Sequence, residues 1–191
     1  NIYMLPFIKP ANVRKFYPDA EIKSYTDAIS VAVESMNIDI CERNVLITHQ
    51  FVTGAGRSDS EDISVGGSDN VDASVFDAFD YVALGHIHNA QNIKSERIRY
   101  CGTPLKYSIS EAGCDKSVTI VELKEKSAEA EHCEISVRTT PLEPKRDIVR
   151  LKGLYRELTE RSFYENTSYK NDFVHITLTD EDDIIDAVGK L

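Results

Sequence analysis

Two apolar segments that each end in histidine constrain the fold more than any other feature of this sequence. Residues 44–49 read Asn-Val-Leu-Ile-Thr-His, and residues 80–88 read Asp-Tyr-Val-Ala-Leu-Gly-His-Ile-His. Short runs rich in β-branched and aromatic residues predict strands that are buried in a sheet. Open α/β sheets place their ligand-binding groups just beyond the carboxyl ends of such strands. We therefore expect both segments to deliver histidines to one site at the edge of a sheet.

The spacing of His86 and His88 favours metal binding. In extended chain, side chains two residues apart point to the same face, about 6.6–6.8 Å apart along the strand. That separation suits two ions about 3.5–4 Å apart better than one small ion. Gly85 allows a turn that a Cβ atom would forbid. Any one of these histidines taken singly is more simply an ordinary half-buried residue, but His49, His86 and His88 together favour a metal site.

Several further motifs occur in a fixed order around the second histidine segment. The Gly-His-x-His of residues 85–88 stands among Val-Gly-Gly-Ser-Asp-Asn-Val at 65–71, Arg-Tyr-Cys-Gly-Thr-Pro at 99–104 and Lys-Ser-Val-Thr-Ile-Val-Glu at 116–122. Together they resemble the second half of the SbcD family, the nuclease subunits of bacterial SbcC–SbcD DNA repair complexes. That family belongs to the calcineurin-like metallophosphoesterases. The resemblance covers nearly the whole chain and implies that His49, His86 and His88 are metal ligands.

The sequence also departs from this family. The D-x-H, G-D and G-N-H-[DE] motifs with which SbcD proteins begin do not occur, and residues 1–6 resemble the middle of the family sequence. We therefore expect this chain to be a fragment without the bridging carboxylate and the catalytic histidine. It should have no nuclease activity by itself.

The resemblance implies a function for the parent protein. It would be an exonuclease and endonuclease that hydrolyses phosphodiester bonds at DNA ends and hairpins, in DNA repair, recombination and replication. Its cofactor would be two Mn²⁺ ions, with Mg²⁺ or Zn²⁺ as alternatives. Its partners would be DNA and the SbcC ATPase subunit, and the full-length protein would be a cytoplasmic homodimer. The alternative is a non-catalytic module that docks DNA or a protein and in which the histidines are structural.

Composition narrows these possibilities. The formal net charge of the 191 residues is −10, which argues against broad electrostatic capture of DNA by this chain. Residues 145–161 hold six Lys or Arg against three acids, so a local contact with phosphates stays open beside a simply solvated surface. The sequence contains no apolar run of about 18 residues, so it predicts no membrane-spanning helix. The four cysteines form no C-x-x-C pair, which favours reduced thiols in a cytoplasm.

The remaining patterns predict the order of elements. We expect strands at 2–5, 44–49 and 81–85, and a helix that begins at Ser24 with Asp27 completing its cap. Hairpins should follow at 91–94 with 97–100, turning at 95–96, and at 117–124 with 133–139. His132, between the last two strands, should lie at the surface. After a proline-containing linker at 141–144, the expected order is strand 147–151, helix 154–161, strand 172–178 and helix 181–188. His175 reads as a sheet residue.

The fold class expected from these patterns is α/β. Together with the resemblance, they imply part of a four-layer α/β/β/α metallophosphoesterase fold at residues 1–140. The start of a small α+β capping subdomain, which orients DNA, would follow at 141–191. Residues 54–70 should form either a solvated, mobile loop or a loop that lies near the metal pocket and shapes access for a phosphodiester strand. Its acids are poor candidates for a bridging ligand because they do not lie on a rigid element; they are Asp59, Glu61, Asp62 and Asp69.

Overall fold

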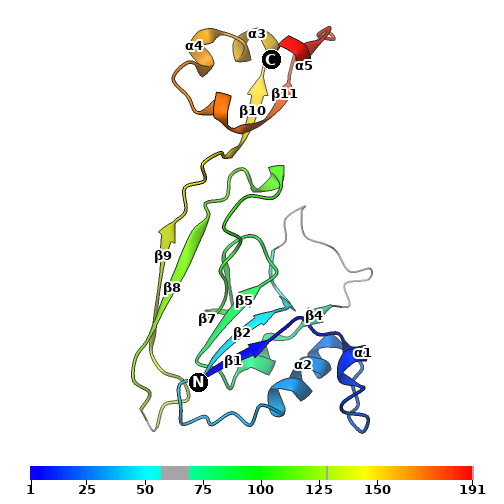
Figure 1. The fold of residues 1–191 in the computed structure, drawn as a ribbon, viewed down its shortest axis with the longest axis vertical. Coiled ribbons are helices and arrows are strands. Elements are labelled where there is room, and N and C mark those ends of the chain that lie inside the picture. The colour runs from blue at the N-terminus through cyan, green and yellow to red at the C-terminus, as the bar shows by residue number, and fades with distance from the viewer. Residues whose placement is uncertain (57–68, 128, 191) are drawn as a thin grey trace. The chain divides into compact units, whose positions relative to one another are not determined.

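The computed structural model describes residues 1–56, 69–127 and 129–190 (Figure 1). The chain forms two compact units. The first unit comprises residues 1–104 and 116–142, and the second comprises residues 105–115 and 143–191. The expected domain boundary after residue 140 stays a prediction.

A five-stranded sheet forms the centre of the first unit (Figure 1). Its strand order is β1-β2-β5-β7-β6, where β1 is Ile2–Leu5, β2 is Val45–His49, β5 is Tyr81–Gly85, β7 is Ser95–Tyr100 and β6 is Gln91–Ile93. The first four strands are parallel to their neighbours, and β6 runs antiparallel to β7. The expected strands at 2–5, 44–49 and 81–85 are confirmed, and so is the mixed α/β class. The parallel order places the carboxyl ends of β2 and β5 at the same edge.

One face of this sheet carries the core, and its residues follow the strand alternation. Leu46 and Val82 face each other across β2 and β5, and both are fully buried. Phe76 and Phe79 pack against the same cluster, with Phe76 in the short helix η1 (Ala73–Phe76). On the opposite face the side chains of β1 and β2 are exposed, and they include Ile2 (71%), Met4 (79%) and Ile47 (46%). His49 shares the face of Ile47, since side chains two residues apart point the same way.

The expected helix cap is confirmed. The helix α2 (Tyr25–Glu34) begins after Ser24, whose Oγ accepts a hydrogen bond from the Asp27 N–H at 3.1 Å. The Asp27 carboxylate in turn accepts from the Ser24 N–H at 2.8 Å and from the Lys23 N–H at 2.9 Å. These backbone donors lower the pKa of Asp27. The helix buries Ala28, Ile29 and Val33 and follows the shorter α1 (Pro10–Val13).

Two hairpins differ from the sequence expectation at their turns. β6 and β7 connect through Lys94 alone, at φ +60°, and Ile93 pairs with Ser95 across a register shift. The expected turn at 95–96 is therefore wrong, because one left-handed residue reverses the chain and lets residues 95 and 96 join the strand. β8 (Ser117–Leu123) pairs antiparallel with β9 (Ile135–Pro141), which starts two residues later than expected and takes in Pro141. β3 (Phe51–Val52) and β4 (Asn70–Val71) form a small parallel pair.

The second unit is built on two parallel strands, β10 (Ile148–Gly153) and β11 (Phe173–Leu178). Its short helices are η2 (Ile109–Glu111), α3 (Tyr155–Leu158), α4 (Arg161–Tyr164), η3 (Tyr169–Asn171) and α5 (Ala187–Lys190). The expected strand–helix–strand order is confirmed, with two short helices where one was expected. The helix expected at 181–188 is wrong, because Asp186 is left-handed at φ +56° and α5 begins only after it. His175 lies in β11 opposite Arg150, as expected of a sheet residue.

Candidate metal centre

His49 and His86 come together because β2 and β5 are parallel neighbours in register. His49 is the last residue of β2, and its partner across the sheet is Gly85, the last residue of β5. His86 follows immediately. The centroids of the two imidazole rings are 5.3 Å apart, and the ring planes lie at 83°. The sheet thus brings two nitrogen-bearing rings from different strands to one point on its carboxyl edge.

Gly85 leaves the space that the His49 ring occupies. A Cβ atom built on Gly85 would stand 2.8 Å from Nδ1 of His49, closer than real Cβ contacts. The turn that the sequence suggested at Gly85 is made instead by His86, whose φ is +103°. Left-handed backbone is uncommon for a residue with a Cβ and occurs often at functional sites. Gly85 therefore makes room for the His49 ring, and the left-handed backbone is that of His86, the proposed metal ligand.

The segment after His49 is anchored from the neighbouring strands. The fully buried Tyr100, at the end of β7, donates from its hydroxyl to the Gln50 carbonyl at 2.7 Å and accepts from the Val52 N–H at 2.8 Å. The Gln50 amide donates to the Pro6 carbonyl at 3.0 Å. The Phe51 ring lies 6.2 Å from the His86 ring. Sequence reasoning missed Tyr100, although a tyrosine at the end of a strand next to the histidine strands is a visible signal.

His88 lies two residues beyond His86 and is half-buried. The intervening Ile87 is only 1% exposed and belongs to the core, which anchors this part of the chain. Within residues 1–56, 69–127 and 129–190, no three metal-ligating side chains lie together closely enough to hold an ion. The assignment of His49, His86 and His88 as ligands therefore stays a prediction. The paired imidazoles of His49 and His86 fit half of a divalent metal site, since neutral imidazole is the commonest protein metal ligand.

Most of the loop expected at residues 54–70 lies outside the described residues. Asp59, Glu61 and Asp62 lie outside the described residues. Asp69 is described and is 6% exposed.

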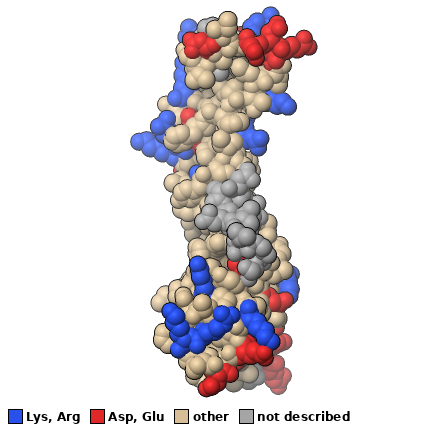
Figure 2. Space-filling view, turned by 90° about the vertical axis from the view of Figure 1, so that its right-hand side faces the viewer, with Lys and Arg blue, Asp and Glu red and all other residues tan. Residues whose placement is uncertain are grey.

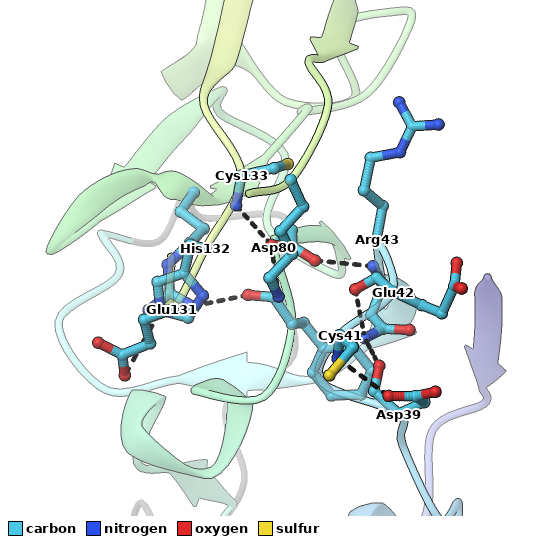
Figure 3. Close-up of polar contacts among 12 residues, drawn as sticks. Asp39, Cys41, Glu42, Arg43, Asp80, Glu131, His132 and Cys133 are labelled. Atoms are coloured by element: carbon cyan, nitrogen blue, oxygen red, sulfur yellow. Dashed lines mark hydrogen bonds and ion pairs between the residues drawn. The ribbon is translucent and has the colours of Figure 1, made fainter. Parts of the chain in front are cut away.

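A buried carboxylate holds the opposite end of β5 (Figure 3). Asp80 is fully buried and accepts from the backbone N–H groups of Asn44 at 2.8 Å and Cys133 at 2.7 Å. It also pairs with the ammonium of Lys126 at 3.2 Å, whose side chain is 4% exposed. Burial by itself raises the pKa of Asp80, but the two backbone donors and Lys126 outweigh it, so that the pKa is lowered. Asp80 thus ties β2, β5 and the β8–β9 connection together, a structural role.

His132 lies beside this carboxylate (Figure 3). Its side chain is 24% exposed, so the residue expected at the surface is half-buried. Burial and the nearby Arg97 guanidinium lower its pKa, although Glu131 and Asp80 act in the opposite direction. The sequence could not indicate this partial burial, because it arises from tertiary contacts. The β8–β9 connection contacts Asp80 through Lys126 and Cys133.

The fold and this edge define a mixed α/β protein with paired histidines at the carboxyl ends of parallel strands, in agreement with part of a metallophosphoesterase-like fold. No family model matches the chain. It is similar to the SbcD subunit of the SbcCD nuclease of Staphylococcus epidermidis, with 30% identity over 192 residues that cover 99% of this chain and 49% of the relative. The chain thus spans about half the length of the curated relative it matches. In the described part of the chain, no helix has the length and hydrophobicity needed to cross a bilayer.

Proposed function

We propose that this chain is part of a metal-dependent nuclease that hydrolyses phosphodiester bonds in DNA. His49 and His86 would bind one divalent ion and His88 a second, with Mn²⁺ as the expected metal and Mg²⁺ or Zn²⁺ as alternatives. The observation that carries the proposal is the His49–His86 ring pair, 5.3 Å apart across two parallel strand ends. The similarity to the SbcD subunit of the staphylococcal SbcCD nuclease along 99% of the chain supports it.

The contribution of this chain to such a site is positional. When bound, two divalent ions activate a water and neutralise charge on the phosphoryl group. His49, His86 and His88 would act as neutral imidazoles, and Gly85 would leave room for the His49 ring. The D-x-H, G-D and G-N-H-[DE] motifs of the SbcD family are absent from the sequence. We therefore expect no nuclease activity from this chain alone on linear duplex DNA with Mn²⁺.

We further propose DNA and an SbcC-type ATPase subunit as partners, in a cytoplasmic protein whose full-length form is a homodimer. Figure 2 shows Lys and Arg side chains, with Asp and Glu side chains beside them, on the face of the first unit that carries α1 and α2. Residues 9–23 supply exposed basic side chains to this region, namely Lys9, Arg14, Lys15 and Lys23. Lys23 pairs with Glu21 at 2.5 Å, so Lys9, Arg14 and Lys15 are the side chains that would neutralise phosphates, although the net charge of the chain is −10.

The test is a calorimetric titration of the purified chain with Mn²⁺ and with Zn²⁺. His86→Ala and His88→Ala should each lower metal affinity by at least about tenfold, since each removes a ligand. His175→Ala, in β11 of the second unit, is the matched control and should leave metal uptake unchanged. Unchanged uptake in both site variants would refute the metal assignment.

The second candidate is a non-catalytic module that docks DNA or a protein. It is favoured by the finding that the described residues bring no three metal-ligating side chains together. The same titration separates the two. A docking module would retain its binding partner in the His86→Ala variant, whereas metal uptake would be negligible in every variant.

A further inference from the structure

Three hydrogen-bond donors converge on one backbone oxygen next to the histidine pair. The carbonyl of His88 accepts from the Thr103 N–H at 3.0 Å, from the Lys116 ammonium at 3.0 Å and from the Thr103 hydroxyl at 3.4 Å. The Lys116 ammonium also donates to the Thr103 hydroxyl oxygen at 3.0 Å. His88, Thr103 and Lys116 thus form a closed triangle of contacts, in which two distant segments hold the peptide unit of His88 between β5 and β6.

The approach of the two loops depends on Gly102. Its φ is +77°, a conformation that residues with a Cβ rarely adopt. A Cβ there would stand 2.8 Å from the His88 carbonyl oxygen and 2.9 Å from the Ala90 nitrogen. Glycine therefore permits the loop that carries Thr103 to lie directly against the His88 backbone.

Lys116 is itself held rigidly. The residue is 6% exposed and directly precedes β8, and its carbonyl accepts from the Leu142 N–H at 2.8 Å, just after β9. At the other end of β8, Lys126 pairs with Asp80, which directly precedes β5. Two buried lysines therefore fasten the ends of the β8 strand to the two ends of β5. Lys116 contacts the His88 carbonyl near the proposed metal site, and Lys126 contacts the Asp80 carboxylate.

We propose that Lys116 and Thr103 are positioning residues for His88. They hold the His88 carbonyl in place. This fixes the backbone position from which the His88 side chain extends. A buried ammonium stabilises such a contact more than a neutral donor does, because charge-assisted hydrogen bonds are the stronger ones. The ligand role of His88 rests on the proposed function, whereas the contacts that hold its backbone carbonyl do not.

The experiment uses the intact chain and two readouts. Nuclear magnetic resonance of the imidazole ring signals in the metal-free protein reports the order of each histidine, and paramagnetic resonance with Mn²⁺ reports metal affinity. Lys116→Met and Thr103→Val should shift and broaden the His88 ring signal and lower Mn²⁺ affinity by about tenfold. Thr103→Ser, which keeps the hydroxyl, should restore both. Lys126→Met removes an equally buried ammonium from the far end of β5 and should leave the His88 signal unchanged.

The outcomes separate the two proposals. An unaltered His88 signal in both Lys116→Met and Thr103→Val would overturn the positioning role, whatever the metal does. Equal changes in Lys126→Met would also overturn it, because they would show that loss of any buried lysine disturbs the ring. If the unsubstituted protein takes up no Mn²⁺ while the His88 signal still responds to Lys116→Met, the metal proposal fails and the positioning role stands.

Discussion

Replacing Gly85 with alanine should separate the metal site from the stability of the fold. The added Cβ would stand 2.8 Å from Nδ1 of His49, whereas ordinary van der Waals contact begins at 3.4 Å. The His49 ring must therefore retreat by more than a few tenths of an ångström, and rotation about its side-chain bonds is the least costly way. That rotation changes how the ring is placed against His86, now 5.3 Å distant between centroids.

We expect the substitution to leave stability nearly unchanged and to lower metal affinity. Gly85 is a strand residue without left-handed backbone, so alanine gains about 0.5–1 kcal/mol from reduced unfolded-state entropy. An off-rotamer His49 costs about 0.5–1.5 kcal/mol, and the two nearly cancel. Metal affinity should fall about 10- to 100-fold, because a displaced ligand no longer reaches the ion.

The assay pairs urea unfolding with Mn²⁺ titration of the same samples. Gly113→Ala is the matched control, because a Cβ at Gly113 meets nothing within 4 Å. It should leave both quantities unchanged. A Gly85→Ala protein that binds Mn²⁺ within about twofold of the unsubstituted chain would refute the reasoning, since the free space at Gly85 would then have no part in ligand placement.

Three further substitutions test the surrounding structure. Gly102→Ala should lower the free energy of unfolding by at least about 1–2 kcal/mol, measured with urea, because alanine is strained at φ +77° and meets the His88 carbonyl. Asp80→Asn should cost about 3–5 kcal/mol, since it leaves Lys126 buried without its carboxylate. Folding lowers the pKa of Asp80, so its contribution to stability is present above the ordinary pKa near 3.9 and is lost as pH falls through the folded pKa. The free energy of unfolding should therefore fall less steeply with acid in Asp80→Asn than in the unsubstituted chain. Ser24→Ala should cost about 1 kcal/mol in the same urea assay by removing the α2 cap, and an unchanged midpoint would contradict the capping role.

Local signals decided most of the elements that the sequence predicted correctly. The cap of α2 depends on Ser24 and Asp27, three residues apart, and both hydrogen bonds form as expected. The turns were less predictable. Lys94, His86 and Asp186 all adopt left-handed backbone, and although Asp and His do so more often than most residues, many other Asp residues in the described part of this chain do not. Tertiary packing selects those positions, which is why the hairpin turn and the last helix were misplaced.

The sequence by itself determined that two strands end in histidine and that a Gly-His-x-His follows the second. It could also indicate the family resemblance, since motifs are local. Only the tertiary structure decided that His49 crosses Gly85 to meet His86, because that contact depends on the parallel register of β2 and β5. The same holds for Lys116, which lies 28 positions from His88 along the chain and meets its carbonyl only after the loops have folded together. Contacts between distant segments depend on how strands pair and pack, and no local pattern of residues specifies that.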